Sequence, residues 1–345
     1  MASSENEAQR DLTIRSIGAD DEFAAQAAVD KLLSDFGKHK GISQVIHAVA
    51  QHYERVKGEP EKALGLHRYN VEHFSSDIYA MWSQVELVYF QIRDGNEAGA
   101  DEAFGKLLTL FADQPTLPKE IYQVGDEYAK ALNYNKAELL YQYVIANWPG
   151  GEYEMWARTG IVKLDICLGN DANVQPALEQ LFVDFNDQPA LPEAVFVIGE
   201  QYYNKAFQCK NEGWSAEARE NFLKAIVIWE KIITDLPSSL YTPQAYYFSA
   251  DCLRGLGEHK KAIEYYQKII VDWPDYENAW SSQYFIGFTY EKLGKTGAIS
   301  KFATKTATKE AYEKVLQNYP DCPAANAARN WLNITSSQVK EDKNE

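Results

Sequence analysis

Residues 185–203 read FNDQPALPEAVFVIGEQYY, and residues 111–128 read FADQPTLPKEIYQVGDEY. The two stretches begin 74 residues apart, and a weaker copy, FGKHKGISQVIHAVAQHY, begins at Phe36. In both strong copies Asp-Gln-Pro is followed, after two residues, by a second proline. Proline suits the first turn of a helix and cannot continue a helix interior, so this pattern stops one helix and starts another. The chain therefore repeats a helical unit.

The residues after each proline keep one helical register. Small and apolar residues recur at spacings of three, one and three, which places them on one face of a helix. After Pro118 they are Ile121, Val124, Gly125 and Tyr128, followed on a second helix by Ala137, Tyr141 and Val144 before Pro149. After Pro243 they are Tyr246, Ala250, Leu253, Gly257, Ala262, Tyr266 and Ile269 before Pro274. A unit of two helices in about 34 residues resembles the tetratricopeptide repeat.

This resemblance implies an all-α fold, a right-handed superhelical solenoid of antiparallel helix pairs. We expect about seven full repeats plus terminal half-repeat or capping helices over residues 20–335, one of them in ANAARNWLNI after Pro320. This makes fifteen or sixteen helices in all and no sheet, since each repeat buries its apolar face only against its neighbours. Ala28 and Leu32 sit as on a second helix with no first helix before them, which suggests an N-terminal cap or a domain cut from a longer chain. Residues 1–19 are expected to be disordered or tag-like. Residues 336–345 are expected to form a polar tail, and FQCKNEGWSAEAREN to form an enlarged turn around Trp214.

Two further stretches resemble one subclass of this repeat family. They are NYPDCPAANAARNWL and DWPDYENAWSSQYFIGFTY. They are similar to bacterial envelope members of the tetratricopeptide class, the Tol-Pal coordinator and outer-membrane assembly lipoproteins. The chain departs from these in showing no signal sequence, no lipidated cysteine and no N-terminal coiled coil. The localisation therefore stays open, cytoplasmic as written and periplasmic if an export signal has been removed.

Composition excludes several kinds of partner. The 345 residues carry a formal net charge of −16, which repels a phosphate backbone, so we expect no nucleic-acid partner. No apolar run approaches the roughly 18 residues that span a bilayer, so we expect no membrane insertion. The four cysteines lie far apart and are expected to be buried, slowly reacting thiols.

No pattern points to catalysis, a cofactor or a metal. The sequence has no nucleophile elbow, no Walker sequence and no dinucleotide fingerprint. Five of the six histidines lie between His39 and His73, but His47 and His52 are five residues apart and cannot share one metal from one helix face. His67 falls at a packing position. We therefore expect a protein that is not an enzyme and holds no cofactor.

The candidate ligand surface consists of two rows on the first helices, which line the concave side of this repeat. One row is aromatic and the next, four residues on, is acidic. The aromatic row is Tyr122, Phe196, Tyr247 and Tyr284, with His47 earlier, and the acidic row is Asp126, Glu200 and Asp251, with Gln51 earlier. One interpretation is that the rings pack only against the next repeat. The other is a peptide groove whose ligand carries basic and apolar residues.

Three functions remain in contention from the sequence. The first is a non-enzymatic scaffold that binds a partner segment in this groove. The second is an accessory of cell-envelope assembly or division of the Tol-Pal type. The third is the helical regulatory domain of a larger enzyme or transporter.

Overall fold

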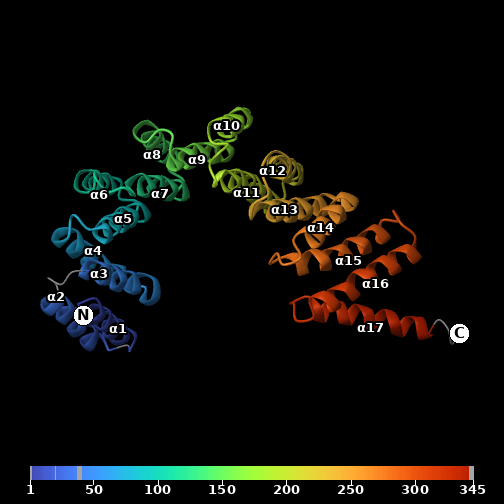
Figure 1. Ribbon diagram of the computed structural model, residues 1–345, viewed down its shortest axis with the longest axis horizontal. Helices are drawn as coiled ribbons and strands as arrows, with labels where there is room; N and C mark the ends of the chain where they lie inside the picture. The colour runs from blue at the N-terminus through green and yellow to red at the C-terminus, as the bar shows by residue number, and fades with distance from the viewer. Residues whose placement is uncertain (1, 20, 37–40, 342–345) are drawn as a thin grey trace. The chain divides into compact units, whose positions relative to one another are not determined.

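The computed structural model describes residues 2–19, 21–36 and 41–341, and every regular element in these ranges is helical (Figure 1). The described residues form 17 α-helices and one π-helical turn, η1, without a strand. The all-α prediction is therefore confirmed, although the helices outnumber the expected fifteen or sixteen. The chain divides into two compact units, residues 1–161 and residues 162–345, here called the N-terminal unit and the C-terminal unit.

In the N-terminal unit consecutive helices pack as pairs, α1 with α2, α3 with α4, α5 with α6 and α7 with α8. The helices are α1 (Ala2–Gly18), α2 (Glu22–Phe36), α3 (Ile42–His52), η1 (Tyr53–Lys57), α4 (Pro60–His73), α5 (Ile78–Arg93), α6 (Glu97–Leu110), α7 (Leu117–Lys130) and α8 (Tyr134–Asn147). The next helix, α9 (Glu152–Leu168), contains the boundary between the units.

The C-terminal unit continues the pairing, α11 with α12, α13 with α14 and α15 with α16, and α17 packs on α16. The helices are α10 (Asp171–Asp184), α11 (Leu191–Asn211), α12 (Ser215–Asp235), α13 (Tyr241–Leu256), α14 (His259–Asp272), α15 (Ala279–Lys295), α16 (Lys301–Asn318) and α17 (Ala325–Glu341). Among the described residues, no helix is both long and apolar enough to cross a bilayer.

The prolines start helices as the sequence predicts. Pro60, Pro118 and Pro192 each lie in the first turn of a helix, where the missing amide proton would have no partner in the helix. Side chains cap other helices, and the Asp77 carboxylate accepts from the backbone amide of Tyr79 at 2.8 Å.

The expected enlarged turn around Trp214 is wrong. Helices α11 and α12 each run for 21 residues, and only three residues separate them, with Gly213 at φ +84°. The inserted stretch is rich in alanine, glutamate, lysine and arginine, which favour helix, and it has no glycine or proline before Gly213. The insertion therefore lengthens both helices of one pair.

Both ends of the chain also differ from expectation. The stretch 1–19, expected to be disordered or tag-like, contains α1, which packs against α2 and α3 and buries Gln9, Thr13 and Ile17. These three residues lie four apart on one face, but only Ile17 is apolar, so the periodic signal is weak. At the other end α17 is the helix expected after Pro320, but it extends to Glu341, into the expected polar tail, whose residues 342–345 lie outside the described ranges.

The core of a helix pair is an aromatic ring of the second helix placed over a glycine of the first. A Cβ added at Gly125 would lie 2.7 Å from Cε1 of Tyr141, and one added at Gly160 would lie 2.7 Å from the other edge of the same ring. Gly287 faces Tyr312 in the same way. Real Cβ atoms do not approach other atoms so closely. Glycine at these positions therefore allows the two helices to pack with only the thickness of one aromatic ring between their backbones.

A second buried feature is polar. His47 and His67, on α3 and α4, are 6% and 1% exposed, and their ring centroids are 5.4 Å apart. His47 Nδ1 lies 3.2 Å from Ser83 Oγ, whereas both ring nitrogens of His67 are buried without a hydrogen-bond partner among the described residues. Burial, with the charge of Arg55, lowers the pKa of His47 to about 4. Burial, with the charges of His47 and Arg55, lowers the pKa of His67 to about 3.

Replacing Gly125 by alanine should destabilise the N-terminal unit, because the new methyl group forces the Tyr141 ring out of its position. We expect a loss of about 1–3 kcal/mol in the free energy of unfolding, measured by urea denaturation. Gly105→Ala is the matched control, since a Cβ at this helical glycine of α6 meets nothing within 4 Å. That substitution should stabilise by about 0.5–1 kcal/mol. Equal effects at both sites would contradict the close-packing role of Gly125.

Acid should destabilise the N-terminal unit through the two buried histidines. Their pKa values in the folded chain lie below the ordinary 6.5, so the unfolded chain binds protons more readily and the free energy of unfolding falls as the pH drops from 6.5 to about 4. The two shifts together correspond to a loss on the order of 5 kcal/mol over this range.

The test of this pH dependence is urea unfolding across that range, followed by tryptophan fluorescence. His67→Gln should reduce the acid-induced loss, because one of the two buried titrating groups is gone. His73→Gln, at an exposed position of the same helix, should leave the wild-type dependence unchanged. A His67→Gln profile that parallels the wild type would show that the buried pair does not drive the effect.

Candidate functional site

Within each unit the first helices of successive pairs lie side by side and make one surface, here called the first-helix face. In the N-terminal unit α3 contacts α5 and α5 contacts α7, and in the C-terminal unit α11 contacts α13. Polar side chains join these helices. Trp82 Nε1 on α5 donates to Glu120 on α7 at 3.1 Å, and the hydroxyls of Tyr247 on α13 and Ser281 on α15 are 3.0 Å apart. Both candidate rows lie on these helices.

The rings of the aromatic row pack on rings of their own repeats. The centroid distances are 5.6 Å for Tyr122–Tyr141, 5.7 Å for Phe196–Trp229, 6.1 Å for Tyr247–Tyr266 and 5.3 Å for Tyr284–Tyr312. Phe196 is 6% exposed, and Trp229 Nε1 donates to its carbonyl at 3.1 Å, so this residue belongs to the core. The other three rings are half-buried and present one edge or face to the surface.

The acidic row is in part engaged within the fold. Tyr141 donates its hydroxyl proton to Asp126 at 2.6 Å, which ties the first helix of that pair to the second. Asp251 forms an ion pair with Arg254 one turn further along α13. Glu200 is exposed on α11. The acidic row therefore does not present a uniform negative surface.

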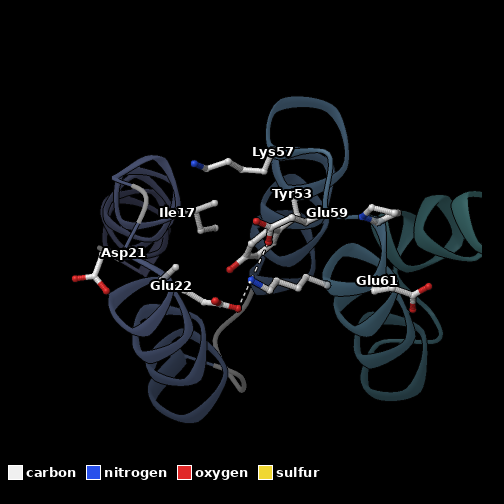
Figure 2. Close-up of a pocket in the computed structure, with 10 residues that line it drawn as sticks. Ile17, Asp21, Glu22, Tyr53, Lys57, Glu59 and Glu61 are labelled. Carbon is white, nitrogen blue, oxygen red and sulfur yellow. Dashed lines mark hydrogen bonds and ion pairs between the residues drawn. The ribbon is translucent and has the colours of Figure 1, made fainter.

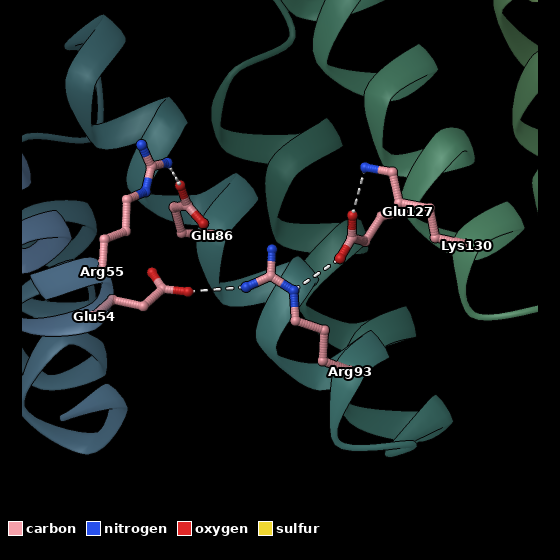
Figure 3. A network of polar contacts seen from close by, with 6 residues as sticks. All are labelled: Glu54, Arg55, Glu86, Arg93, Glu127 and Lys130. Atoms are coloured by element: carbon pink, nitrogen blue, oxygen red, sulfur yellow. Dashed lines mark hydrogen bonds and ion pairs between the residues drawn. The ribbon is translucent and has the colours of Figure 1, made fainter. Parts of the chain in front are cut away.

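A network of ion pairs links three repeats across the first-helix face of the N-terminal unit (Figure 3). Arg93 bridges Glu54 and Glu127, with 2.8 Å to each carboxylate, and Lys130 lies 3.2 Å from Glu127. Burial raises the pKa of Glu127, but the hydrogen bonds and charges of Arg93 and Lys130 outweigh it and lower the pKa overall. Glu127 is 12% exposed and Lys130 73%, so the bases lie outermost in this network.

Arg93, Glu127 and Lys130 of this network line a cleft of about 430 Å³, and His47, Gln51 and Asp126 also line it. Three residues of the candidate rows in the N-terminal unit are therefore brought together, while Tyr122 does not line the cleft. Cations and carboxylates are mixed along its walls. Paired charges therefore lie beside the rings of Trp82 and Tyr89 in this cleft.

A cavity of about 510 Å³ lies between α1–α2 and η1–α4 (Figure 2). Its carboxylates surround a lysine, since Lys62 Nζ lies 3.1 Å from Glu22 and 2.8 Å from Glu59. The ammonium also lies 5.7 Å from the centre of the Tyr53 ring. The hydrogen bonds that the Lys62 ammonium donates to Glu59 and Glu22 raise its pKa to about 12. These ion pairs connect α2 to the start of α4. No cluster of metal-ligating residues occurs in the described part of the chain.

The lengthened pair α11–α12 forms a second cleft, here called the hairpin cleft, with the end of α13. Its volume is about 440 Å³, and residues from all three helices line it. Phe207, Lys210, Arg219, Phe222, Asp251 and Arg254 are among them. Sequence reasoning found only Asp251 of this set. The sequence did hold a signal for the longer helices, because helix-favouring residues continue on both sides of Gly213. The prediction of an enlarged turn overlooked it.

All four cysteines are free in the structure. Cys209 and Cys252 are buried, whereas Cys167 and Cys322 are half-buried, so the prediction that all four are buried is wrong for these two. Burial, with the charge of Asp251 adding to it, raises the pKa of the Cys252 thiol. A thiol held in its neutral form is a poor nucleophile, which agrees with the slow reactivity expected from the sequence.

Comparison with known proteins supports the repeat. Residues 244–276 match the tetratricopeptide repeat family, and this stretch holds most of α13, all of α14, and the candidate residues Tyr247 and Asp251. No curated protein sequence matches the chain.

Solved structures resemble the chain at low identity. A tetratricopeptide repeat protein from Parabacteroides merdae ATCC 43184 is 14% identical, with 81% of this chain and 97% of that chain covered and a TM-score of 0.41. Pseudomonas aeruginosa pilF is 12% identical, with 70% and 96% covered and a TM-score of 0.37. The human IFIT1 dimer with PPP-AAAA is 14% identical, with 100% and 78% covered and a TM-score of 0.39.

The fold is thus all-α, with helices packed in adjacent pairs as in tetratricopeptide arrays, and one of these pairs carries the family's sequence pattern.

Proposed function

We propose that the chain is a non-enzymatic protein-interaction scaffold that binds a segment of a partner protein on its first-helix face. Two findings support this function. The first helices of each unit form a continuous surface that displays rings and charges, and the pair that matches the tetratricopeptide repeat family contains two of the candidate residues. Repeats that stack without enclosing a pocket offer such extended surfaces for binding.

In the C-terminal unit the partner segment is one that interleaves basic and apolar residues. Tyr247 and Tyr284 offer half-buried rings to apolar side chains, and Glu200 offers an exposed carboxylate to lysine or arginine. Phe196 is excluded from direct contact by its burial. Nucleic acid is a poor alternative for a chain with a net charge of −16.

The position of Tyr247 is the observation that carries this proposal. Its ring contacts Phe248, Tyr266 and Tyr276, and its hydroxyl is hydrogen-bonded to Ser281 of the next first helix. The ring is therefore held by several contacts, while the residue as a whole stays half-exposed. A rigid, half-exposed aromatic ring is the kind of side chain that contributes most to binding at protein interfaces.

Peptides recovered from a displayed random library against the whole chain should bind more weakly to Tyr247→Ala than to wild type, by roughly five- to thirtyfold, as for loss of an anchor worth about 1–2 kcal/mol. Tyr247→Phe is the matched control, because it removes only the hydroxyl and should keep most of the affinity. Fluorescence anisotropy gives the dissociation constants, and thermal melting shows whether each variant remains folded.

Glu200→Gln should weaken the binding of basic peptides mainly at low salt and flatten its salt dependence, because an exposed charge pair is screened by ions. Two results would overturn the proposed function. One is a library that yields no peptide binding above an unrelated protein. The other is a set of peptides whose affinity is the same for wild type, Tyr247→Ala and Glu200→Gln.

A further inference from the structure

The hairpin cleft exists because one helix pair is longer than the next. Helices α11 and α12 have 21 residues each, whereas α13 has 16 and ends at Leu256. The last turns of α11 and the first turns of α12 therefore project past α13, and their inner side is covered only in part. A cleft of about 440 Å³ lies where α11 and α12 extend beyond the end of α13.

The wall of the cleft is aromatic. The rings of Phe207 on α11 and Phe222 on α12 lie edge to face, with centroids 5.3 Å apart and planes at 88°. Tyr203, one turn before Phe207, extends the cluster at a centroid distance of 4.8 Å. Phe207 and Phe222 are half-buried, so each still offers apolar surface to the cleft. An apolar or aromatic side chain of a ligand would complete this packing.

The charges around the cleft are mostly positive, in contrast to the chain as a whole. Lys210, Arg219 and Arg254 line it, and Asp251 is the one acidic residue among the described lining residues. Asp251 is already paired with Arg254. The remaining cations, Lys210 and Arg219, are exposed at the rim.

Both arginines are held in place. The Arg219 guanidinium donates to the carbonyl of Leu256 at 3.2 Å, at the end of α13. Arg254 lies over the Phe285 ring at 4.5 Å, and its Nε is buried without a hydrogen-bond partner among the described residues. Guanidinium groups fixed in this way lose little freedom when they bind a carboxylate, which they recognise through paired N–H donors.

We propose that the hairpin cleft binds a peptide segment of a partner protein that carries carboxylates next to an aromatic or large aliphatic side chain. The carboxylates would meet Arg219 and Lys210, and the apolar side chain would pack against the exposed parts of the Phe207 and Phe222 rings. This inference rests on the proposed scaffold function. It assigns an acidic ligand to the hairpin cleft, whereas the ligand proposed for the Tyr247 surface is basic. A nucleic acid also combines negative charge with flat rings, but the field of a chain with a net charge of −16 opposes a phosphate backbone.

Gly255 allows the cleft to be blocked without disturbing the core. It lies within α13, lines the cleft, and a Cβ added there meets nothing within 4 Å. The substitution Gly255→Phe therefore places a ring in the cleft. Gly105→Phe is the matched control, on an exposed helical glycine of α6 that also has open space around it. Arg219→Glu tests the charge, with Lys305→Glu as a control at an exposed lysine of α16.

Three labelled probes are titrated against the whole chain by fluorescence anisotropy: the capped peptide Glu-Phe-Glu-Leu-Glu, the capped peptide Lys-Phe-Lys-Leu-Lys, and an oligoadenylate. We expect the acidic peptide to bind wild type, to bind Gly255→Phe and Arg219→Glu at least about tenfold more weakly, and to bind both control variants as it binds wild type. Its affinity should fall as salt rises.

Absence of binding by the acidic peptide, or binding that is insensitive to Gly255→Phe, would overturn this inference. Preferential binding of the oligoadenylate that Gly255→Phe abolishes would overturn it in favour of a nucleic-acid site. Binding of the basic peptide that depends on Tyr247, together with no binding of the acidic peptide, would overturn the hairpin cleft alone and leave the scaffold function standing. Circular dichroism of each variant shows that the helical fold is retained.

Discussion

The contact between a second-helix ring and a first-helix glycine is the constraint on which the rest of the structure depends. Gly125 and Gly160 admit the two edges of the Tyr141 ring, Gly199 admits Trp229, and Gly287 admits Tyr312. Where the first helix has no side chain, the ring of the second can lie directly against its backbone. This sets the spacing of the helices, and every other contact within the pair must accommodate that spacing.

This core arrangement determines what the first-helix face can offer. Each ring of the aromatic row lies over the ring that fills its repeat, so the surface of the scaffold is also the outer layer of its core. A face built in this way is rigid, which reduces the entropy lost when a ligand binds. It also means that removal of a ring affects folding as well as binding. Phe196 is the extreme case, because its ring is buried in the core and has no surface left for a ligand.

Charge on these surfaces is organised locally and does not follow the net charge. In the N-terminal unit, Arg93 joins carboxylates of two neighbouring helices, and the bases are more exposed than the acids. Exposed ion pairs of this kind contribute little to stability. They do decide which ligand charge a surface accepts. In the C-terminal unit the hairpin cleft gathers cations although acidic residues dominate the chain.

The sequence alone determined the helix pairs, their prolines and the glycine positions, because these follow from helical periodicity and from short-range steric rules. It also identified the first helices that carry the candidate rows. Only the tertiary structure decided which of those side chains remain accessible. Phe196 and Tyr247 occupy the same register, but one is buried and the other half-exposed, because exposure depends on the rings that neighbouring helices supply. The hairpin cleft likewise arises from a difference in length between adjacent helices: the sequence holds a signal for the longer helices, but only their packing beside the shorter α13 creates the cleft.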